Sequence, residues 1–235
     1  MVYKRVLLKL SGESIGYKPS NSGISKESLE EIAREIKLAM KKNKVQLSIV
    51  IGAGNILRGK EINFIERTTA DYMGMLSTVI NSLALQSALE NQGLKTRVMS
   101  AIDMPKIAES YIRRRAIRHL EKGRIIIFAA GTGNPYFTTD TTAALRAIEI
   151  NADILIKATQ VDGVYSDDPK KNLKAKKFRE ITFMEAIKRQ LKIMDTTAFS
   201  LCMENKLPVV VFNLYKKGNL LKVLEGKSEV GTVIK

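Results

Sequence analysis

Short apolar runs alternate along the chain with segments that have a helical hydrophobic period. Six runs of four to seven residues lack the strict alternation of a half-exposed strand, and they are Val6 to Leu10, Gln46 to Ile51, Thr96 to Met99, Arg124 to Ala130, Ile154 to Ala158 and Val209 to Asn213. Strands that are buried on both faces have this pattern. Together with the helical segments between them, the runs predict an α/β fold in which helices connect the strands of a mostly parallel sheet.

Helices are predicted from apolar stripes and from capping residues. Ser25 has the position of an N-cap before the stripe Leu29, Ile32, Ala33, Ile36 and Met40. A second stripe, which Gly93 ends, is expected to pack into the core, and it contains Met73, Leu76, Ile80, Leu83 and Ser87. Thr182 with Glu185 predicts a capping box, and Asp195 precedes a further helix.

The composition is that of a globular protein with a strong positive charge. With 235 residues and 45% hydrophobic composition the chain can bury a full core, and we expect one domain over residues 1–235. Lysine and arginine outnumber aspartate and glutamate by 39 to 24, and the net charge of +15 favours nucleic acids, acidic membranes or nucleotide phosphates as partners. No apolar stretch approaches the roughly 20 residues that cross a bilayer, so we expect a cytoplasmic protein without a membrane partner.

The single cysteine and the single histidine limit the chemistry. Cys202 alone excludes an internal disulfide and a cysteine-built metal site, and we expect it in the core of a protein from a reducing compartment. His119 lies in the segment Tyr111 to Gly123, whose polar face we expect in solvent. Catalysis by a histidine triad and metal binding by a histidine cluster are therefore not expected.

Turns rich in glycine or hydroxyl groups follow three of the predicted strands, at the end of the sheet where α/β proteins bind ligands. They are KLSGES (Lys9 to Ser14), IGAGNILRG (Ile51 to Gly59) and TGNPYFTTDTTAALRA (Thr132 to Ala147). The second turn is not a Walker A loop, because Glu61 replaces the magnesium-binding serine or threonine. Nor is it a dinucleotide-binding fingerprint, because Leu57 replaces the last glycine.

The first two of these turns suit phosphate binding. Small residues at 52 to 54 expose consecutive backbone N–H groups, and Arg58 can fork onto phosphate oxygens; a tight turn with a solvated arginine is the alternative. Lys9 lies at the end of a buried strand, where an ammonium group is costly unless it meets an anion. An edge position with the ammonium in water is the alternative for Lys9.

Five motifs that occur in order along the chain resemble those of bacterial uridylate kinases, which belong to the amino acid kinase superfamily. They are K-L-S-G from Lys9, G-A-G-N-x-x-R-G from Gly52, A-D-x-M-G-M-L from Ala70, G-T-G-N-P-Y-F-T-T-D from Gly131 and K-A-T-x-V-D-G-V-Y from Lys157. The resemblance spans residues 3 to about 213. It implies a three-layer αβα sandwich that assembles as a homohexamer and transfers the γ-phosphoryl group of ATP to UMP in pyrimidine nucleotide biosynthesis. The ATP phosphates would carry Mg²⁺, the protein would have no metal site of its own, and nucleic acid is not an expected partner.

The resemblance also implies catalytic and donor-binding roles. Lys9 and Arg58 would neutralise the charge on the transferring phosphoryl group, and Asp140 and Asp195 would orient Lys9 and the hydrated magnesium ion. Helix N-capping is the alternative role for both aspartates. The residues implied to bind ATP are Lys9, Leu10, Ser11, Gly12, Gly54, Arg58, Thr159, Tyr165 and Asp168. Asp168 could instead belong only to the turn that Pro169 indicates.

Recognition of UMP gives a reason for the hydroxyl-rich stretch. Uracil has two carbonyls and one N–H, so a site for it needs small donors and acceptors in one loop. By resemblance, Asp71 takes the ribose hydroxyls, and the UMP-binding residues are Ala53, Asp71, Thr132, Gly133, Asn134, Pro135, Tyr136, Phe137, Thr138 and Thr139. Thr141 and Thr142 are expected to bond back to the helix backbone.

Two features depart from the family pattern. Ala53 stands where the family usually has glycine, so its backbone must have an ordinary conformation. The loop from Gly16 to Gly23 lacks the glycine-rich form of GTP-activated members. Activation by GTP and inhibition by UTP are therefore open.

Two other functions compete with UMP phosphorylation. Relatives in the superfamily phosphorylate a carboxylate or a carbamate, but the G-N-P-Y-F-T-T-D stretch argues against those acceptors. Nucleic-acid binding would use the net charge of +15 and the cluster Arg113 to Arg115, which lies on a predicted helix beside Ile112, Ile117 and Leu120. A solvated polar face is the favoured interpretation of that cluster.

Overall fold

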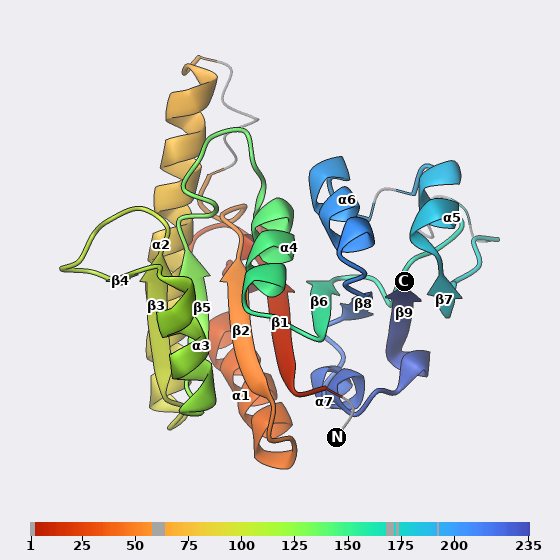
Figure 1. Ribbon diagram of the computed structural model, residues 1–235, viewed down its shortest axis with the longest axis horizontal. Helices are drawn as coiled ribbons and strands as arrows, with labels where there is room; N and C mark the ends of the chain where they lie inside the picture. The colour runs from red at the N-terminus through yellow and green to blue at the C-terminus, as the bar shows by residue number, and fades with distance from the viewer. Residues whose placement is uncertain (1–2, 58–63, 168–171, 173, 192) are drawn as a thin grey trace.

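In the part of the chain that the structure describes, a nine-stranded sheet forms the centre, and helices cover both of its faces (Figure 1). The computed structural model describes residues 3–57, 64–167, 172, 174–191 and 193–235. The strands lie in the order β4-β3-β5-β2-β1-β6-β8-β9-β7, and they are β1 (Arg5–Leu10), β2 (Gln46–Ile51), β3 (Thr96–Ser100), β4 (Glu109–Ser110), β5 (Ile125–Ala129), β6 (Ile154–Thr159), β7 (Glu180–Ile181), β8 (Val209–Asn213) and β9 (Gly231–Ile234). The helices are α1 (Lys26–Lys42), α2 (Arg67–Asn91), α3 (Arg113–Glu121), α4 (Thr139–Glu149), α5 (Phe183–Lys188), α6 (Thr196–Glu204) and α7 (Asn219–Leu224).

The six predicted strands are confirmed as β1, β2, β3, β5, β6 and β8, and they pair in parallel. Most of their residues are buried on both faces, as the continuous apolar runs predicted. The sequence did not indicate β4, β7 and β9. The first two have only two residues each, and β9, which pairs antiparallel with β8, has four. Such short strands contain too few residues for a period to be recognised.

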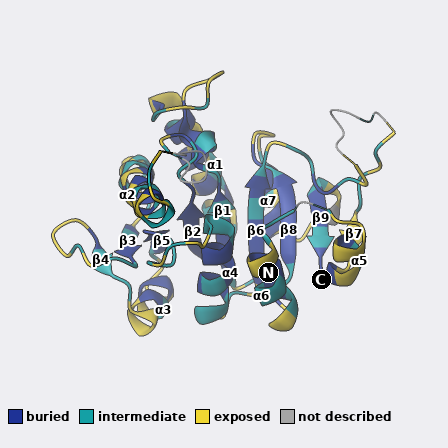
Figure 2. Cartoon of the chain, turned by 90° about the horizontal axis from the view of Figure 1, so that it is seen from above, coloured by how far each residue is buried: buried dark blue, intermediate teal, exposed yellow. Residues whose placement is uncertain are grey.

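The predicted three-layer αβα arrangement is confirmed (Figure 2). One helical layer contains α1, α2 and α7, which pack in the same core as Val6, Leu8 and Leu10 of β1. The other layer contains α3, α4, α5 and α6, and its core includes the intervening Leu7. Because side chains alternate along a strand, Lys9 points to the same side as Leu7, where it meets α4.

The predicted helix starts are confirmed by their hydrogen bonds. Ser25 caps α1 by accepting from the N–H of Ser28 at 3.2 Å, and Thr182 caps α5 by accepting from the N–H of Glu185 at 3.1 Å. The arginine cluster Arg113–Arg115 opens α3 and is exposed. This exposure agrees with the solvated polar face that the sequence favoured.

The buried face of α2 differs from the predicted one. Leu76 and Ile80 of the predicted stripe are 50% and 49% exposed, whereas their neighbours Met75 and Val79 are buried in the core. The helix has apolar residues on more than one side, so their spacing alone did not identify the inner face. α2 therefore presents apolar side chains both to the core and to the surface.

The prediction of a solvated His119 was also wrong. The imidazole is only 8% exposed, its Nε2 lies 3.0 Å from Oε2 of Glu109, and Nη1 of Arg124 lies 2.8 Å from its Nδ1. Because an arginine can only donate, Nδ1 accepts and Nε2 carries the proton that points to Glu109. The histidine thus links α3 to β4 and to the start of β5.

Candidate active site

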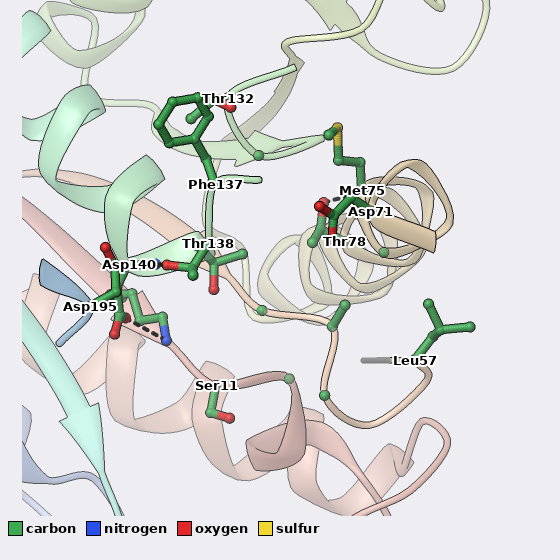
Figure 3. A pocket seen from close by; sticks show the side chains of 18 of the residues that line it. Ser11, Leu57, Asp71, Met75, Thr78, Thr132, Phe137, Thr138, Asp140 and Asp195 are labelled. Atoms are coloured by element: carbon green, nitrogen blue, oxygen red, sulfur yellow. Dashed lines mark hydrogen bonds and ion pairs between the residues drawn. The ribbon is translucent and has the colours of Figure 1, made fainter. Parts of the chain in front are cut away.

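A cavity of about 510 Å³ opens at the carboxyl ends of β1, β2 and β5 (Figure 3). Its walls come from the turns after these strands, from the first half of α2, from the first turn of α4 and from Asp195 before α6. The carboxyl ends of parallel strands meet at one edge of a sheet. For this reason turns that are far apart in the sequence share the cavity.

Most of the predicted site residues line this cavity. They are Lys9, Ser11, Gly12, Ala53, Gly54, Asp71, Thr132, Asn134, Phe137, Thr138, Thr139, Asp140 and Asp195. The predicted residues that do not line it are Leu10, Gly133, Pro135, Tyr136, Thr159 and Tyr165. Arg58 and Asp168 lie outside the described residues. The ligand contacts of all these residues stay predictions.

The turns after β1 and β2 lie against each other. A Cβ on Gly12 would be 2.6 Å from the carbonyl O of Gly52 and 2.7 Å from N of Gly54, so only glycine fits there. Ala53 is not among the described residues with positive φ, so its methyl group is compatible with an ordinary backbone conformation. Within the described part of the chain, no hydrogen bond uses the N–H of Ala53 or of Gly54. These two cavity-lining amides can therefore bind an anion.

Two lysines and one aspartate form a charge cluster beside the cavity. Nζ of Lys9 lies 2.8 Å from Oδ1 of Asp140, and Nζ of Lys157 lies 2.5 Å from Oδ2. Lys9 and Lys157 are register partners on the neighbouring strands β1 and β6, and both reach the first turn of α4. Lys157 also donates to the carbonyl O of Ile193 at 2.6 Å.

Burial and the neighbouring charges have opposite effects on the pKa of Asp140. Burial alone would raise the pKa of Asp140, but attraction by the Lys9 and Lys157 ammonium groups outweighs it and holds this pKa below its ordinary value. Burial lowers the pKa of Lys157. Lys9 therefore meets the cavity while paired with a carboxylate that stays ionised.

Asp195 connects the N-termini of α4 and α6. It caps α6 by accepting from the N–H of Ala198 at 3.0 Å, and it accepts hydrogen bonds from the hydroxyls of Thr138 and Thr141. N-capping, the alternative for both aspartates, thus applies to Asp195. It does not apply to Asp140, which follows the N-cap of α4.

The hydroxyls at the start of α4 have different roles. Thr138 is the N-cap and accepts from two N–H groups of the first turn. Thr142 bonds back to the Thr138 carbonyl at 2.9 Å, as expected. For Thr141 that expectation was wrong, because its hydroxyl donates to Asp195 at 2.9 Å across the gap between two helices. Thr139 lines the cavity.

Asp71 holds the loop after β5 against α2. Its Oδ2 accepts from Nε of Arg67 at 2.8 Å and from the N–H of Tyr136 at 2.8 Å. Tyr136 has a φ of 70° and Ala130, at the start of the same loop, has a φ of 60°. Non-glycine residues rarely have positive φ, and such strained positions gather at ligand sites. Phe137 follows Tyr136 and lines the cavity.

Two of the residues predicted to bind the donor nucleotide, Thr159 and Tyr165, lie outside the cavity. Thr159 ends β6, and its hydroxyl donates to the carbonyl of Val161 at 2.8 Å. Tyr165 forms an antiparallel bridge with Lys177. Neither Thr159 nor Tyr165 lines the cavity, and their role in ATP binding stays a prediction.

Several residues of the cavity were not predicted. They are Leu57, Arg67, Gly74, Met75, Thr78 and Gly131. Met75 and Thr78 were missed because the inner face of α2 was assigned incorrectly. Lys157 begins one of the five motifs, but the sequence predicted no role for it. Its position could have indicated one, because Lys157, like Lys9, is a lysine in a buried central strand, where an unpaired ammonium group is costly.

In the described part of the chain, few side chains could act as a nucleophile or hold a metal ion. Burial, reinforced by the charges of Asp140 and Asp195, raises the pKa of Cys202 to about 12, so the thiol stays protonated. Its predicted core position is confirmed. Among the described residues no group of three or more histidine, cysteine, aspartate or glutamate side chains could hold a metal ion. Within the residues that the structure describes, no helix is long and apolar enough to cross a membrane.

Comparison with known proteins assigns the chain to a family. A sequence profile of the amino acid kinase family matches residues 4–213, which contain all the cavity-lining residues. The chain belongs to the amino acid kinase family. Within that family, the resemblance to uridylate kinases seen in the motifs is confirmed by solved structures.

This amino acid kinase is similar over its whole length to two UMP kinases of known structure. The enzyme from Bacillus anthracis is 41% identical with a TM-score of 0.94, and the match covers 99% of this chain and 96% of that chain. The enzyme from Ureaplasma parvum is 40% identical with a TM-score of 0.92, and the match covers 100% of both chains. The uridylate kinase from Archaeoglobus fulgidus is 29% identical with a TM-score of 0.72, over 98% of this chain and 99% of that chain.

Proposed function

We propose that the protein is a uridine monophosphate kinase, which transfers the γ-phosphoryl group of ATP to UMP and gives UDP and ADP. One observation carries this function: Lys9, paired with Asp140, shares a cavity with the glycine turn at 52–54 and the hydroxyl-rich loop at 132–139. Similarity to UMP kinases over the whole chain supports UMP as the acceptor. We place the reaction in pyrimidine nucleotide biosynthesis in the cytoplasm.

Catalysis in this proposal consists of positioning and charge stabilisation, which supply most of the rate of phosphoryl transfer. We call residues 11–12 and 52–54 the phosphate turns. The N–H groups of Ala53 and Gly54 would hold phosphate oxygens, Lys9 would neutralise the charge that develops on them, and Arg58 would add a second cation. No strong base is needed, because the second ionisation of a phosphate monoester lies near pH 6 and the attacking oxygen is already deprotonated at pH 7.

The two nucleotides would approach from different sides. The loop at 132–139 would surround uracil. Asp71 would bind the ribose through Oδ1, because both hydrogen bonds described for its carboxylate use Oδ2. Thr159, Tyr165 and Asp168 would bind ATP, with the Tyr165 ring on the adenine. Thr159 and Tyr165 do not line the cavity, which suits a donor whose phosphates alone reach Lys9.

We propose that Mg²⁺ arrives with the ATP phosphates. Both oxygens of Asp140 contact lysines, so this carboxylate is a poor metal ligand. Asp195 lines the cavity and would contact the hydrated ion, which fits the preference of Mg²⁺ for water, phosphates and one or two carboxylates. When bound, the ion neutralises part of the phosphate charge.

A magnesium-dependent assay of ADP release tests the function. We expect turnover with UMP, much slower turnover with CMP, and little with GMP, carbamate or acetylglutamate. Lys9→Ala and Arg58→Ala should each lower turnover on the order of a hundredfold. Preference for carbamate or acetylglutamate would assign another activity of the family, and near-normal turnover in both variants would remove the two cationic roles.

We also propose that the protein assembles as a homohexamer in which the outer face of α2 is a contact. This face is formed by Tyr72, Leu76 and Ile80, which lie one helical turn apart and are all exposed. Phe64, before the helix, is 88% exposed. A contiguous exposed apolar stripe of this kind marks a protein contact.

A further inference from the structure

Two buried asparagines lie behind the phosphate turn at 52–54 and have no part in the reaction proposed above. Asn55 follows this turn and is 4% exposed, and Asn81 lies in the middle of α2 and is 0% exposed. Burying a side-chain amide costs free energy unless its polar atoms are hydrogen-bonded. An apolar side chain would avoid that cost, so the pair needs a specific reason.

The two side-chain amides form a closed set of hydrogen bonds. Nδ2 of Asn81 donates to the carbonyl O of Gly52 at 2.8 Å and to Oδ1 of Asn55 at 2.7 Å. Nδ2 of Asn55 donates to the carbonyl O of Gly23 at 2.6 Å and to Oδ1 of Asn81 at 3.0 Å. Each amide thus uses both of its N–H donors, and the two backbone carbonyls, which can only accept, determine which way each amide faces.

The pair touches both phosphate turns. A Cβ on Gly12 would lie 2.5 Å from Oδ1 of Asn55 and 2.6 Å from the Gly52 carbonyl O that Asn81 binds. The N–H of Gly23 donates to the carbonyl O of Asn55 at 2.8 Å. Asn81 therefore ties α2 to the turn after β2, and Asn55 ties that turn to the loop that ends at Gly23.

We propose that Asn81 is a positioning residue, which acts through Asn55 and the Gly52 carbonyl to fix the phosphate turn at 52–54 for phosphoryl transfer. This role rests on the proposed kinase function. Backbone N–H groups stabilise developing charge only when they are held in place before the reaction, and a displacement of about 1 Å can lower the rate on the order of a hundredfold. Asn81 also lies on the same helix as Asp71, so one helix aligns the turn with the UMP side of the cavity.

Asn81→Asp tests the role, because it keeps the shape of the side chain but replaces both N–H donors by an oxygen that faces the Gly52 carbonyl. We expect kcat to fall about tenfold to a hundredfold. KM for UMP should change by less than about threefold, since the lost interaction acts on the transferring group. If Asn81 only stabilised the fold, the substitution would lower Tm but would not lower kcat while leaving KM nearly unchanged.

Hydrogen exchange gives a readout that does not depend on activity. The N–H groups of Ile56 and Leu57 donate to the carbonyl of Ala53, and they should exchange about tenfold faster in Asn81→Asp if the turn loosens. Ser82→Ala is the matched control. Ser82 is also 0% exposed on α2, but its hydroxyl donates to a carbonyl within the helix at 2.7 Å. Its kcat and exchange rates should equal those of the wild type.

The kinetics are compared at a temperature where circular dichroism shows every variant folded. Equal kcat in Asn81→Asp and Ser82→Ala would overturn the proposal, as would unchanged exchange at positions 56 and 57. Should Asn81→Asp not fold, Asn55→Ser breaks the pair from the other side and is judged by the same two measurements. A wild-type protein that does not phosphorylate UMP would refute the proposed function instead, and the exchange measurement would still decide whether Asn81 holds the turn.

Discussion

At the scale of single residues, Asp140 controls the charges of the candidate site. Its side chain is 14% exposed and contacts the ammonium groups of Lys9 and Lys157. Two cations at the same register of neighbouring strands repel each other strongly where the dielectric constant is low. The Asp140 carboxylate lies between the two ammonium groups and offsets this repulsion.

Asp140→Asn should damage both activity and stability. Breaking a buried ion pair leaves an uncompensated charge, so we expect a loss of about 3–5 kcal/mol in urea unfolding. Turnover should fall on the order of a hundredfold, because Lys9 would lose its alignment. Glu185→Gln, which removes the carboxylate of the exposed pair with Arg189, should change stability by no more than about 0.5 kcal/mol. Wild-type turnover in Asp140→Asn would contradict the assigned role.

The same carboxylate should make stability depend on pH in the acid range. Because the folded-state pKa of Asp140 lies below its unfolded value of about 3.9, its ionisation favours the folded state above that pH. This contribution is lost as the pH falls through the folded-state pKa. The difference in unfolding free energy between wild type and Asp140→Asn should thus be full at pH 6 and shrink below about pH 4. A difference that stayed constant down to pH 3 would mean that the pKa of Asp140 is not lowered in the folded protein.

The sequence predicted some residues of the site better than others. Lys9 was identifiable because a lysine at the end of a buried strand needs an anion, and Asp140 lies within hydrogen-bond distance of it. Lys157 carried the same signal, but the sequence could not show that it shares Asp140 with Lys9, because the register of β6 against β1 depends on the folded sheet. The assignment of Thr141 to its own helix failed for a similar reason, since its acceptor Asp195 is 54 residues away in the chain.

At the scale of elements, α4 and α6 meet through hydroxyl–carboxylate bonds near their N-termini. Thr138 and Thr141 donate to the carboxylate that caps α6, so a single aspartate fixes the start of one helix and its distance from the other. Both helices border the cavity through their first residues or their cap. Loosening this contact should therefore move groups that line the site.

Thr141→Val keeps the volume of the side chain but removes its bond to Asp195. We expect a loss of about 1.5–3 kcal/mol in chemical unfolding, as for other hydrogen bonds to charged groups. Turnover in the ADP-release assay should fall about tenfold as the two helix ends separate. Thr142→Val is the matched control, because Thr142 is equally buried in the same turn but bonds to its own helix. Equal turnover in the two variants would show that the contact between the helices does not align the site.

Elements with one clear pattern were predicted well, and α2 shows where the pattern fails. The stripe of Leu76 and Ile80 has good helical spacing, yet these side chains are half exposed. The inner face of the same helix carries small and polar residues such as Thr78 and Asn81, which sequence rules place outside. They are buried because they bind backbone groups of the turns after β5 and β2. The burial of Thr78 and Asn81 depends on contacts with other parts of the chain, which the residue pattern of one helix does not predict.

At the scale of the whole molecule, the order of the strands explains where the site lies. From the central β1 the chain first builds one side of the sheet with β2, β3, β4 and β5, and then returns to the other side of β1 with β6. Open α/β sheets bind ligands at this kind of reversal, outside the carboxyl ends of the strands. Lys9 and Lys157 lie on the two strands of the reversal, so their pairing through Asp140 joins the two halves of the sheet at the cavity.

Also at the scale of the whole molecule, substitutions on the outer face of α2 test the proposed assembly. A carboxylate placed in an apolar contact loses its hydration without gaining a partner, so Leu76→Glu and Ile80→Glu should each weaken association. In sedimentation velocity runs we expect a hexamer for the wild type and smaller species for both variants. Met184→Glu is the matched control, because Met184 is a 55% exposed apolar residue on α5, away from this face. A monomeric wild type, or three variants that sediment as the wild type does, would show that the exposed stripe of α2 is not a subunit contact.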